Sequence, residues 1–209
     1  MNINELEKII KQIKKYELED DIENIDVWLK ELNKKQIKNF ISLEVYPLKP
    51  RENLKSLLVN AKALNGDYYL EDIKLINDAK SKRIADCLVY VAGDRYSLKS
   101  KHHREDMILI SNAKSDKIAW YLEIIAKNKY LLKSKYHRED MKRLANAKND
   151  KDANEIYDNI IKQYEVKNKK EESNYVTFQE KIDAIHQNAI EYTDGDTTKE
   201  LNDSVFTLK

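Results

Sequence analysis

Glycine and proline are scarce in this chain, whose 209 residues include only 3 glycines and 2 prolines. Turns that need a positive or a fixed φ must therefore be few, which argues against long β-meanders and against glycine-rich loops that cradle phosphate. Residues that favour helices dominate instead. The composition predicts an all-α protein with enough residues for one good-sized core.

Cysteine and net charge are equally sparse. The single cysteine, Cys87, excludes an internal disulfide framework and fits a reducing compartment. The 38 basic and 37 acidic residues nearly cancel, whereas a nucleic-acid-binding protein usually carries a basic excess. No apolar stretch approaches the roughly 18–20 residues that span a bilayer, and the N-terminal segment lacks an apolar signal core. We therefore expect a cytoplasmic protein with no membrane partner.

The chain does contain an internal repeat. Three segments align without gaps, YYLEDIKLINDAK at 68–80, HHREDMILISNAK at 102–114 and YHREDMKRLANAK at 136–148, so the period is 34 residues. The residues that follow each copy also align. A unit of this length has room for two short helices, neither of which could bury its apolar side alone. The repeat predicts an α-solenoid of stacked helix pairs.

The apolar positions of each unit have helical spacing. They recur every three residues in the shorter element and follow an i, i+1, i+4, i+7, i+8 pattern in the longer one, which is typical of a helix facing a core. The residues expected to be buried are Ile73, Ile76, Ala79, Ile84, Ala85, Leu88, Val91 and Ala92, with their equivalents Met107, Ile110, Ala113, Ile118, Ala119, Leu122, Ile125 and Ala126. Cys87 lies beside this stripe and is expected to be a buried, inert thiol.

These patterns divide the chain into three parts. Residues 1–46 form an N-terminal helical cap, residues 47–166 form the repeat array, and residues 167–209 form a charged linker followed by a C-terminal helix and tail. Pro47 and Pro50 mark the first break. The tail is expected to fold back on the array, with docking on a partner as the alternative.

The last unit is more polar than the others. Arg143, Asp152 and Asn159 stand where the earlier units carry apolar residues. Polar substitutions of this kind are expected where no further unit docks. The array should therefore end near Tyr164.

The recurring HRED motif indicates architecture more than chemistry. Its Glu and Asp lie in the first turn of the shorter helix, where they face the positive end of the helix dipole, worth about 0.3–1 kcal/mol each. The carboxylates recur in all three copies but the histidine in only two, because Tyr69 stands in the first copy where His103 and His137 stand in the others. An inter-repeat site combining His103, His137 and Asp106 is the alternative, and it would make the chain a metal-dependent enzyme using rows of His, Glu and Asp. We expect no catalytic residue, metal or cofactor.

Aromatic side chains supply the candidate binding surface. The chain has 13 tyrosines, and several flank the apolar stripe instead of lying on it. Tyr and Trp on a rigid surface are typical of binding hot spots, although packing at the edge of the core is the alternative explanation. The residues expected to contact a partner protein are Tyr90, Trp120, Tyr121, Tyr130, Arg104 and Arg138.

Lysines recur at the end of each shorter helix. Lys80, Lys114 and Lys148 end the three aligned copies, which read DAK in the first copy and NAK in the other two, and we call them the NAK ladder. A lysine at this position complements the negative end of the helix dipole. The same ladder, together with Arg104 and Arg138, could instead hold phosphates, so nucleic-acid binding is an alternative function.

The segment LKSKYHREDMKRLANAKNDKDAN at 132–154 resembles tandem helical repeats of uncharacterised proteins from AT-rich Firmicutes and their mobile elements. The shared pattern is His-x-x-Asp-Met, a short apolar stretch, Ala-Lys and an alanine in the next helix, and the resemblance covers residues 66–164. The period is similar to tetratricopeptide and Sel1-like repeats in architecture only, since the tetratricopeptide Trp, Gly and Pro signature is absent.

This resemblance implies no particular activity. The expected function is therefore that of a non-enzymatic helical-repeat module that binds another protein. One specific version is a phage or mobile-element inhibitor of a host defence protein. The oligomeric state is left open by the sequence.

Overall fold

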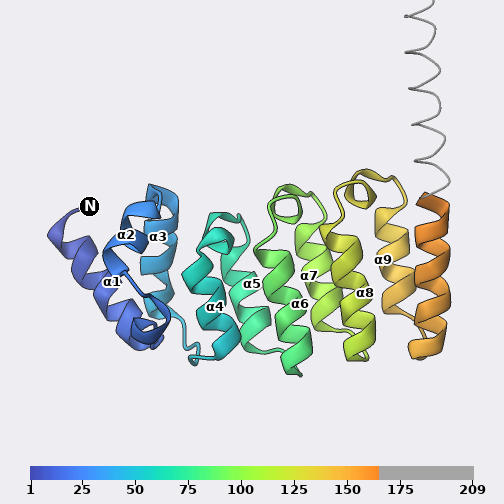
Figure 1. Ribbon diagram of the computed structural model, residues 1–209, viewed down its shortest axis with the longest axis horizontal. Helices are drawn as coiled ribbons and strands as arrows, with labels where there is room; N and C mark the ends of the chain where they lie inside the picture. Colours follow the sequence, from blue (N-terminus) through green and yellow to red (C-terminus); the bar gives the residue numbers. More distant parts are fainter. Residues whose placement is uncertain (165–209) are drawn as a thin grey trace, which may run out of the picture. The chain divides into compact units, whose positions relative to one another are not determined.

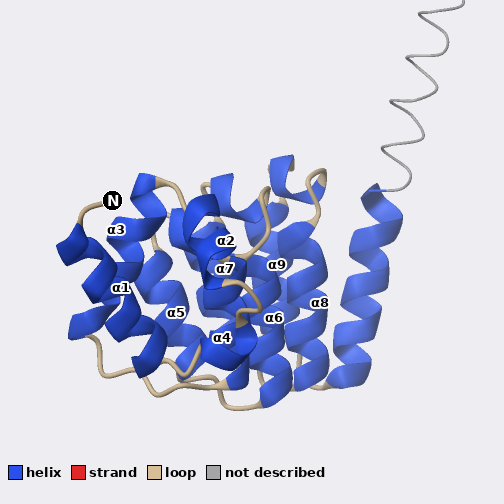
Figure 2. Cartoon of the chain, turned by 60° about the vertical axis from the view of Figure 1, so that its left-hand side comes forward, coloured by secondary structure: helices blue, strands red, loops and turns tan. Residues whose placement is uncertain are grey.

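The computed structural model describes residues 1–164, and every regular element in this range is a helix (Figure 2). The first helices are α1 (Ile3–Lys15), α2 (Ile25–Glu31) and α3 (Lys34–Ser42). They are followed by α4 (Glu52–Asn60), α5 (Tyr69–Asn77), α6 (Lys82–Ala92), α7 (His103–Ser111), α8 (Asp116–Lys127) and α9 (His137–Ala145). Residues 150–164 are also helical. The all-α prediction is confirmed for the described residues.

Short 3-10 turns connect several of these helices. They are η1 (Glu19–Asp21), η2 (Leu43–Val45), η3 (Lys62–Asn65), η4 (Ser97–Lys99) and η5 (Leu131–Lys133). The last three each precede one of the shorter helices α5, α7 and α9. Equivalent residues of the repeat therefore adopt equivalent conformations, because α5, α7 and α9 begin one period apart and so do α6, α8 and the final helical stretch.

The helices from α4 onward lie in two rows (Figure 1). Helices α4, α6 and α8 contact one another in order, and so do α5, α7 and α9. Each helix from α4 to α8 also contacts the next one along the chain. Residues 1–160 form one compact unit. The predicted linker and tail, residues 167–209, lie outside the described residues.

The predicted apolar stripe forms the core between the two rows. Leu88 and Leu122, at equivalent positions of α6 and α8, are completely buried. The other stripe residues are buried as well, except Ala79, which is half-buried. In the last unit, Arg143 and Asn159 are exposed, as expected for polar residues at positions where a further unit would have docked.

Serine residues begin the longer helices and also join successive units. The Ser81 hydroxyl oxygen accepts a hydrogen bond from the backbone N–H of Ile84, which caps α6. The same hydroxyl donates to Asp116 Oδ1, 2.5 Å away at the start of α8. Ser115 repeats this arrangement one period later and donates to Asp150 Oδ1 at 2.5 Å. These bonds fix how far each longer helix is shifted relative to the next.

Candidate functional site

The aromatic residues predicted to bind a partner lie in two places. Tyr90 lies on α6, and Trp120 and Tyr121 lie on α8, the neighbouring helix of the same row. Tyr90 is 54% exposed and Trp120 is 40% exposed, but Tyr121 is only 8% exposed. Tyr130 is 58% exposed and lies in the loop between α8 and α9. The Tyr121 side chain is therefore buried beneath the surface and is not an exposed contact residue.

Tyr121 is buried because it lies between two other aromatic rings. Its centroid is 5.2 Å from that of Trp120 and 4.3 Å from that of Tyr157, and both pairs are stacked. Its hydroxyl donates a hydrogen bond to Asn154 Oδ1. Burial raises the pKa of Tyr157. The stack holds Trp120 in one orientation, which reduces the side-chain entropy lost when a partner binds.

Tyr90 is held from the neighbouring helix. Lys127 Nζ of α8 lies 4.9 Å from the centroid of the Tyr90 ring and 3.1 Å from Glu123 Oε1.

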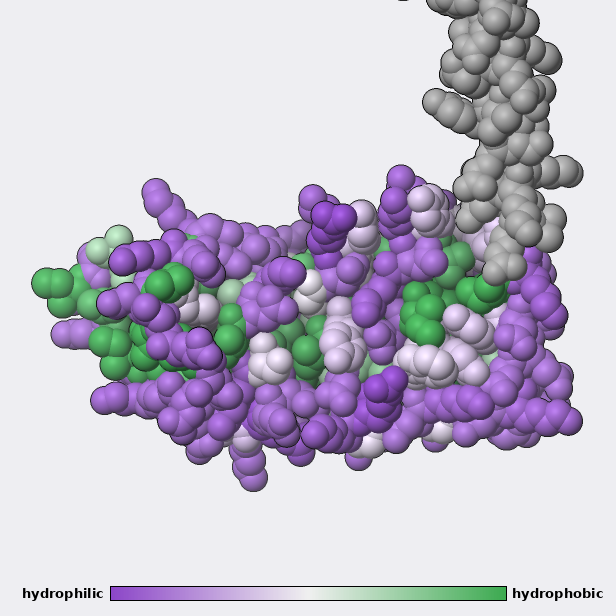
Figure 3. Space-filling view, viewed as in Figure 1, coloured by the Kyte–Doolittle hydropathy of each residue, from purple (hydrophilic) through white to green (hydrophobic). Residues whose placement is uncertain are grey.

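The surface over the row of longer helices includes pale and green side chains bordered by hydrophilic ones (Figure 3). We refer to Tyr90 and Trp120, with Tyr121 and Tyr157 behind Trp120, as the aromatic face.

Cys87 lies on α6 and is completely buried, as predicted. Burial raises the pKa of its thiol from 9.0 to about 12, and a hydrogen bond to the Glu123 carboxylate contributes to the increase. A thiol with such a pKa is almost fully protonated at neutral pH and is a poor nucleophile.

We expect this thiol to make the protein less stable at high pH. The unfolded thiol loses its proton near pH 9.0, whereas the folded thiol keeps its proton to about pH 12. Below about pH 8 both states are protonated and the group has no effect. Above its unfolded pKa, the free energy of unfolding should fall by about 1 kcal/mol between pH 9 and pH 10.

Urea unfolding of the wild type and Cys87→Ala at about pH 8, 9 and 10 measures this effect. The variant loses core packing at every pH, so the informative quantity is the slope with pH. The slope should be smaller in Cys87→Ala. Equal slopes in the two proteins would contradict the expectation.

The HRED histidines pair with aspartates of the preceding copy. His103 Nε2 lies 2.7 Å from Asp72 Oδ2, and His137 Nε2 lies 2.8 Å from Asp106 Oδ2. All four side chains are at most 3% exposed. His103, His137 and Asp106 do not meet at one point, because each histidine serves a different aspartate. Among residues 1–164, no group of three or more His, Cys, Asp and Glu is arranged to hold a metal ion.

The second ring nitrogen distinguishes the two histidines. His103 Nδ1 lies 3.0 Å from the Ser97 hydroxyl. Within the described residues, His137 Nδ1 has no hydrogen-bond partner, because the residue equivalent to Ser97 is Leu131. In the neutral ring, the Nε2–H group donates to the carboxylate, so Nδ1 is the acceptor that Ser97 satisfies.

The acidic residues of the motif have different roles. Burial raises the pKa of Asp72, and the hydrogen bond to His103 opposes this increase. Glu105 lies nearer the surface, with its carboxylate 3.0 Å from Arg138 Nε and 3.2 Å from Lys142 Nζ. Partial burial raises its pKa, but the hydrogen bonds and positive charges of Lys142 and Arg138 together outweigh this effect and hold the pKa below the usual value. From their sequence positions, Glu and Asp were both expected to act as charges in the first turn of the helix. The structure separates a buried aspartate row from a surface glutamate row.

The remaining predicted contact residues have neighbours of their own. Arg138 pairs with Glu105, as described above, and the Arg104 guanidinium lies 5.4 Å from the centroid of the Tyr68 ring. Lys114 Nζ donates to the backbone carbonyls of Asn146 and Ala147 at 3.3 and 3.0 Å.

All three lysines of the NAK ladder are exposed, Lys114 included. Lys80 and Lys148 both lie at the surface. Within residues 1–164, the side chains of Lys80 and Lys148 do not form the hydrogen bonds to backbone carbonyls that Lys114 forms. The three lysines are not equivalent in their surroundings.

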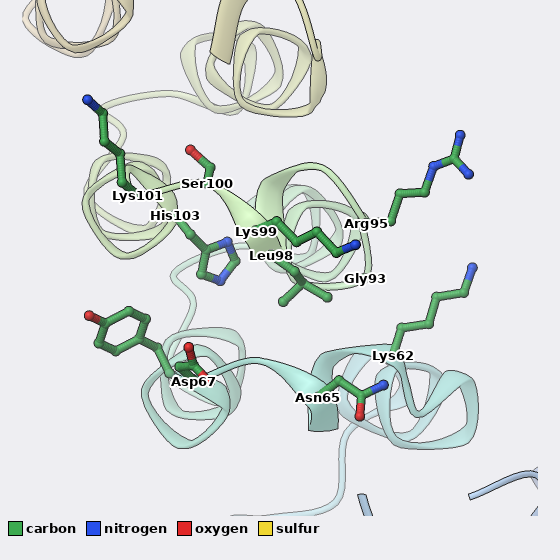
Figure 4. A pocket seen from close by; sticks show the side chains of 11 residues that line it. Lys62, Asn65, Asp67, Gly93, Arg95, Leu98, Lys99, Ser100, Lys101 and His103 are labelled. Atoms are coloured by element: carbon green, nitrogen blue, oxygen red, sulfur yellow. The ribbon is translucent and has the colours of Figure 1, made fainter. Parts of the chain in front are cut away.

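A hollow of about 810 Å³ lies at the end of the helix rows where one loop connects α4 to α5 and another connects α6 to α7. Figure 4 shows Lys62, Arg95 and Lys99 extending toward the same side of it, with the His103 ring opposite. Tyr68 and Asp67 are also part of its lining. None of the residues predicted to bind a protein partner lines this hollow.

Comparison with protein-family models, curated proteins and solved structures finds no match. The resemblance to helical-repeat proteins of Firmicutes therefore stays a prediction. None of the helices described for residues 1–164 has the length and apolarity needed to cross a membrane.

A signal for one side of the hollow, formed by residues 93–103, is present in the sequence and recurs one unit later. The segments 93–104 and 127–138 occupy equivalent positions in two successive units and are rich in lysine and arginine. The near-zero net charge of the whole chain conceals this local excess. Counting the charged residues of each loop separately, at equivalent positions of successive units, would have revealed this local excess of positive charge.

Proposed function

We propose that the chain is an α-solenoid of stacked helix pairs that acts as a non-enzymatic module and binds another protein. The recurring bonds between successive units support this architecture. His103 bonds to Asp72 and His137 to Asp106 in one row, while Ser81 and Ser115 bond to the next unit in the other. A structure joined in this way offers a rigid surface built from equivalent positions.

The observation that carries the binding proposal is the exposed Trp120 held by the stack of Tyr121 and Tyr157. Trp120 is 40% exposed although large aromatic side chains gain most from burial. Tyr90, 54% exposed, lies on the adjacent helix of the same row. Two fixed aromatic side chains on neighbouring helices have the composition of a protein-binding hot spot.

Replacing Trp120 with alanine should weaken partner binding by about 2 kcal/mol, or about 30-fold. The substitution should alter stability much less, because Trp120 lies at the surface. Ile108→Ala is the matched control, since Ile108 is 43% exposed and lies on α7 in the other row. This control should bind the partner as the wild type does.

The measurement has two stages. The tagged wild type, Trp120→Ala and Ile108→Ala are used to capture proteins from extracts of the source organism. A captured protein is then purified and titrated against each variant by calorimetry. Equal affinity for the wild type and both variants, or no directly binding protein, would refute the proposed aromatic face.

A further inference from the structure

Positive charge is concentrated in two equivalent loops. The segments 93–104 and 127–138 contain nine Lys or Arg residues and a single acidic residue, Asp94. The rest of the chain therefore holds 29 basic and 36 acidic residues, because the totals are 38 and 37. A nearly neutral protein thus has two adjacent loops of strongly positive charge.

These loops lie at the same end of the helix rows, where α6 leads to α7 and α8 leads to α9 (Figure 1). We call this surface the loop edge, and its cations are Arg95, Lys99, Lys101, Lys129, Lys133 and Lys135. Among residues 1–164, none of these six cations forms a salt bridge. The Asp94 carboxylate is bonded within its own loop, since its Oδ1 accepts hydrogen bonds from the backbone N–H groups of Tyr96 and Ser97, each at 2.9 Å.

Tyrosine rings alternate with these cations. The Arg95 guanidinium and the Lys129 ammonium each lie 4.6 Å from the centroid of the tyrosine that follows, Tyr96 or Tyr130. Tyr96 is 38% exposed and Tyr130 is 58% exposed. Each loop therefore presents an aromatic surface next to a positive charge.

The surface is also hollowed once per unit. A second hollow of about 360 Å³ adjoins the one of about 810 Å³, and Lys99, Ser100 and Lys101 line both. Lys129, Leu132 and Lys133 in the second hollow are the repeat equivalents of Arg95, Leu98 and Lys99 in the first. Similar positive hollows thus follow one another from unit to unit.

We propose that the loop edge binds single-stranded nucleic acid. The cations match a phosphate backbone, and successive hollows suit a polymer with evenly spaced negative charge. The exposed tyrosines favour unpaired bases, which stack on aromatic rings, over an acidic protein, which offers charge alone. This function is separate from the protein binding proposed for the aromatic face, because the two surfaces share no residue.

Fluorescence anisotropy with a labelled oligothymidylate of about 20 nucleotides tests the proposal on the full chain. Binding is expected at low salt and should weaken steeply as salt rises. Each phosphate contact contributes about −0.7 to the slope of log K against log salt concentration. Absence of binding at about 50 mM salt would overturn the proposal.

The double variant Lys99→Glu/Lys133→Glu should bind at least about tenfold more weakly and show a shallower salt slope, by about 1.4 for two lost contacts. Lys80→Glu/Lys148→Glu is the matched control, since it changes the net charge equally at exposed positions of the NAK ladder. The control should retain most of the affinity. Equal losses in the two double variants would overturn the assignment to the loop edge.

The tyrosines distinguish bases from charge alone. Tyr130→Ala should weaken oligothymidylate binding about fivefold or more, whereas Tyr130→Phe, which keeps the ring, should not. Polyglutamate and vesicles containing anionic lipid should compete poorly with the oligonucleotide. Tighter binding to either competitor, with no effect of Tyr130→Ala, would overturn the proposal in favour of an acidic protein or a membrane surface. Trp120→Ala should leave oligonucleotide binding unchanged, so this test is independent of the aromatic face.

Discussion

Replacing Asp106 with alanine should lower the free energy of unfolding by about 3 kcal/mol, the cost of removing one partner of a buried pair. Asp106 is 1% exposed and accepts a hydrogen bond from the buried ring of His137. Within the described residues, His137 Nδ1 already lacks a partner. The variant would therefore leave both nitrogens of a buried imidazole without a hydrogen bond.

Urea unfolding at neutral pH measures this effect, and Glu105→Ala is the matched control. Glu105 is adjacent in sequence but its ion pairs lie near the surface, so its loss should cost less than about 1 kcal/mol. The double variant Asp106→Leu/His137→Leu should recover much of the lost stability, since no buried polar group is then left unpaired. Asp106→Ala as stable as Glu105→Ala would show that the buried pair contributes little.

The repeat made most of the fold predictable. The apolar stripe identified which side of each helix is buried, because a helix brings residues at these spacings to one face. Leu88 and Leu122 are equivalent in the sequence and equally buried in the structure. Segment 50–64 matches the repeat only loosely, and α4 ends within it at Asn60, where Ala61 adopts a positive φ of 53°.

The pairing of side chains between units was not predictable from helix periodicity. The spacing places Asp106 and Glu105 in the same first turn, and only the position of the next unit shows that one meets His137 and the other meets Arg138. Tyr121 was predicted as a candidate contact residue, with packing at the edge of the core as the alternative, and its 8% exposure agrees with the alternative. Tyr157 stacks on the Tyr121 ring, and the equivalent positions of the earlier units hold Val89 and Glu123, so the repeat gave no signal for an aromatic residue there.

Deleting one whole unit should leave a protein that still unfolds in a single cooperative step. Removal of residues 100–133 takes out one period and joins Lys99 to Ser134, the repeat equivalent of Ser100. If the units stack as proposed, His137 would then lie opposite Asp72. The shortened protein should be less stable, because it loses one unit and one interface between units.

The matched control is a deletion of residues 100–135, which removes two residues more than one period and therefore turns the following apolar stripe by about 200° around the helix axis. The apolar stripe of the last unit would no longer face the preceding helices, so this variant should lose cooperative unfolding and much of its helicity. Circular dichroism and urea unfolding compare the two deletions directly. Similar behaviour of both variants would contradict the stacked-unit architecture, because only a structure whose period is 34 residues distinguishes between them.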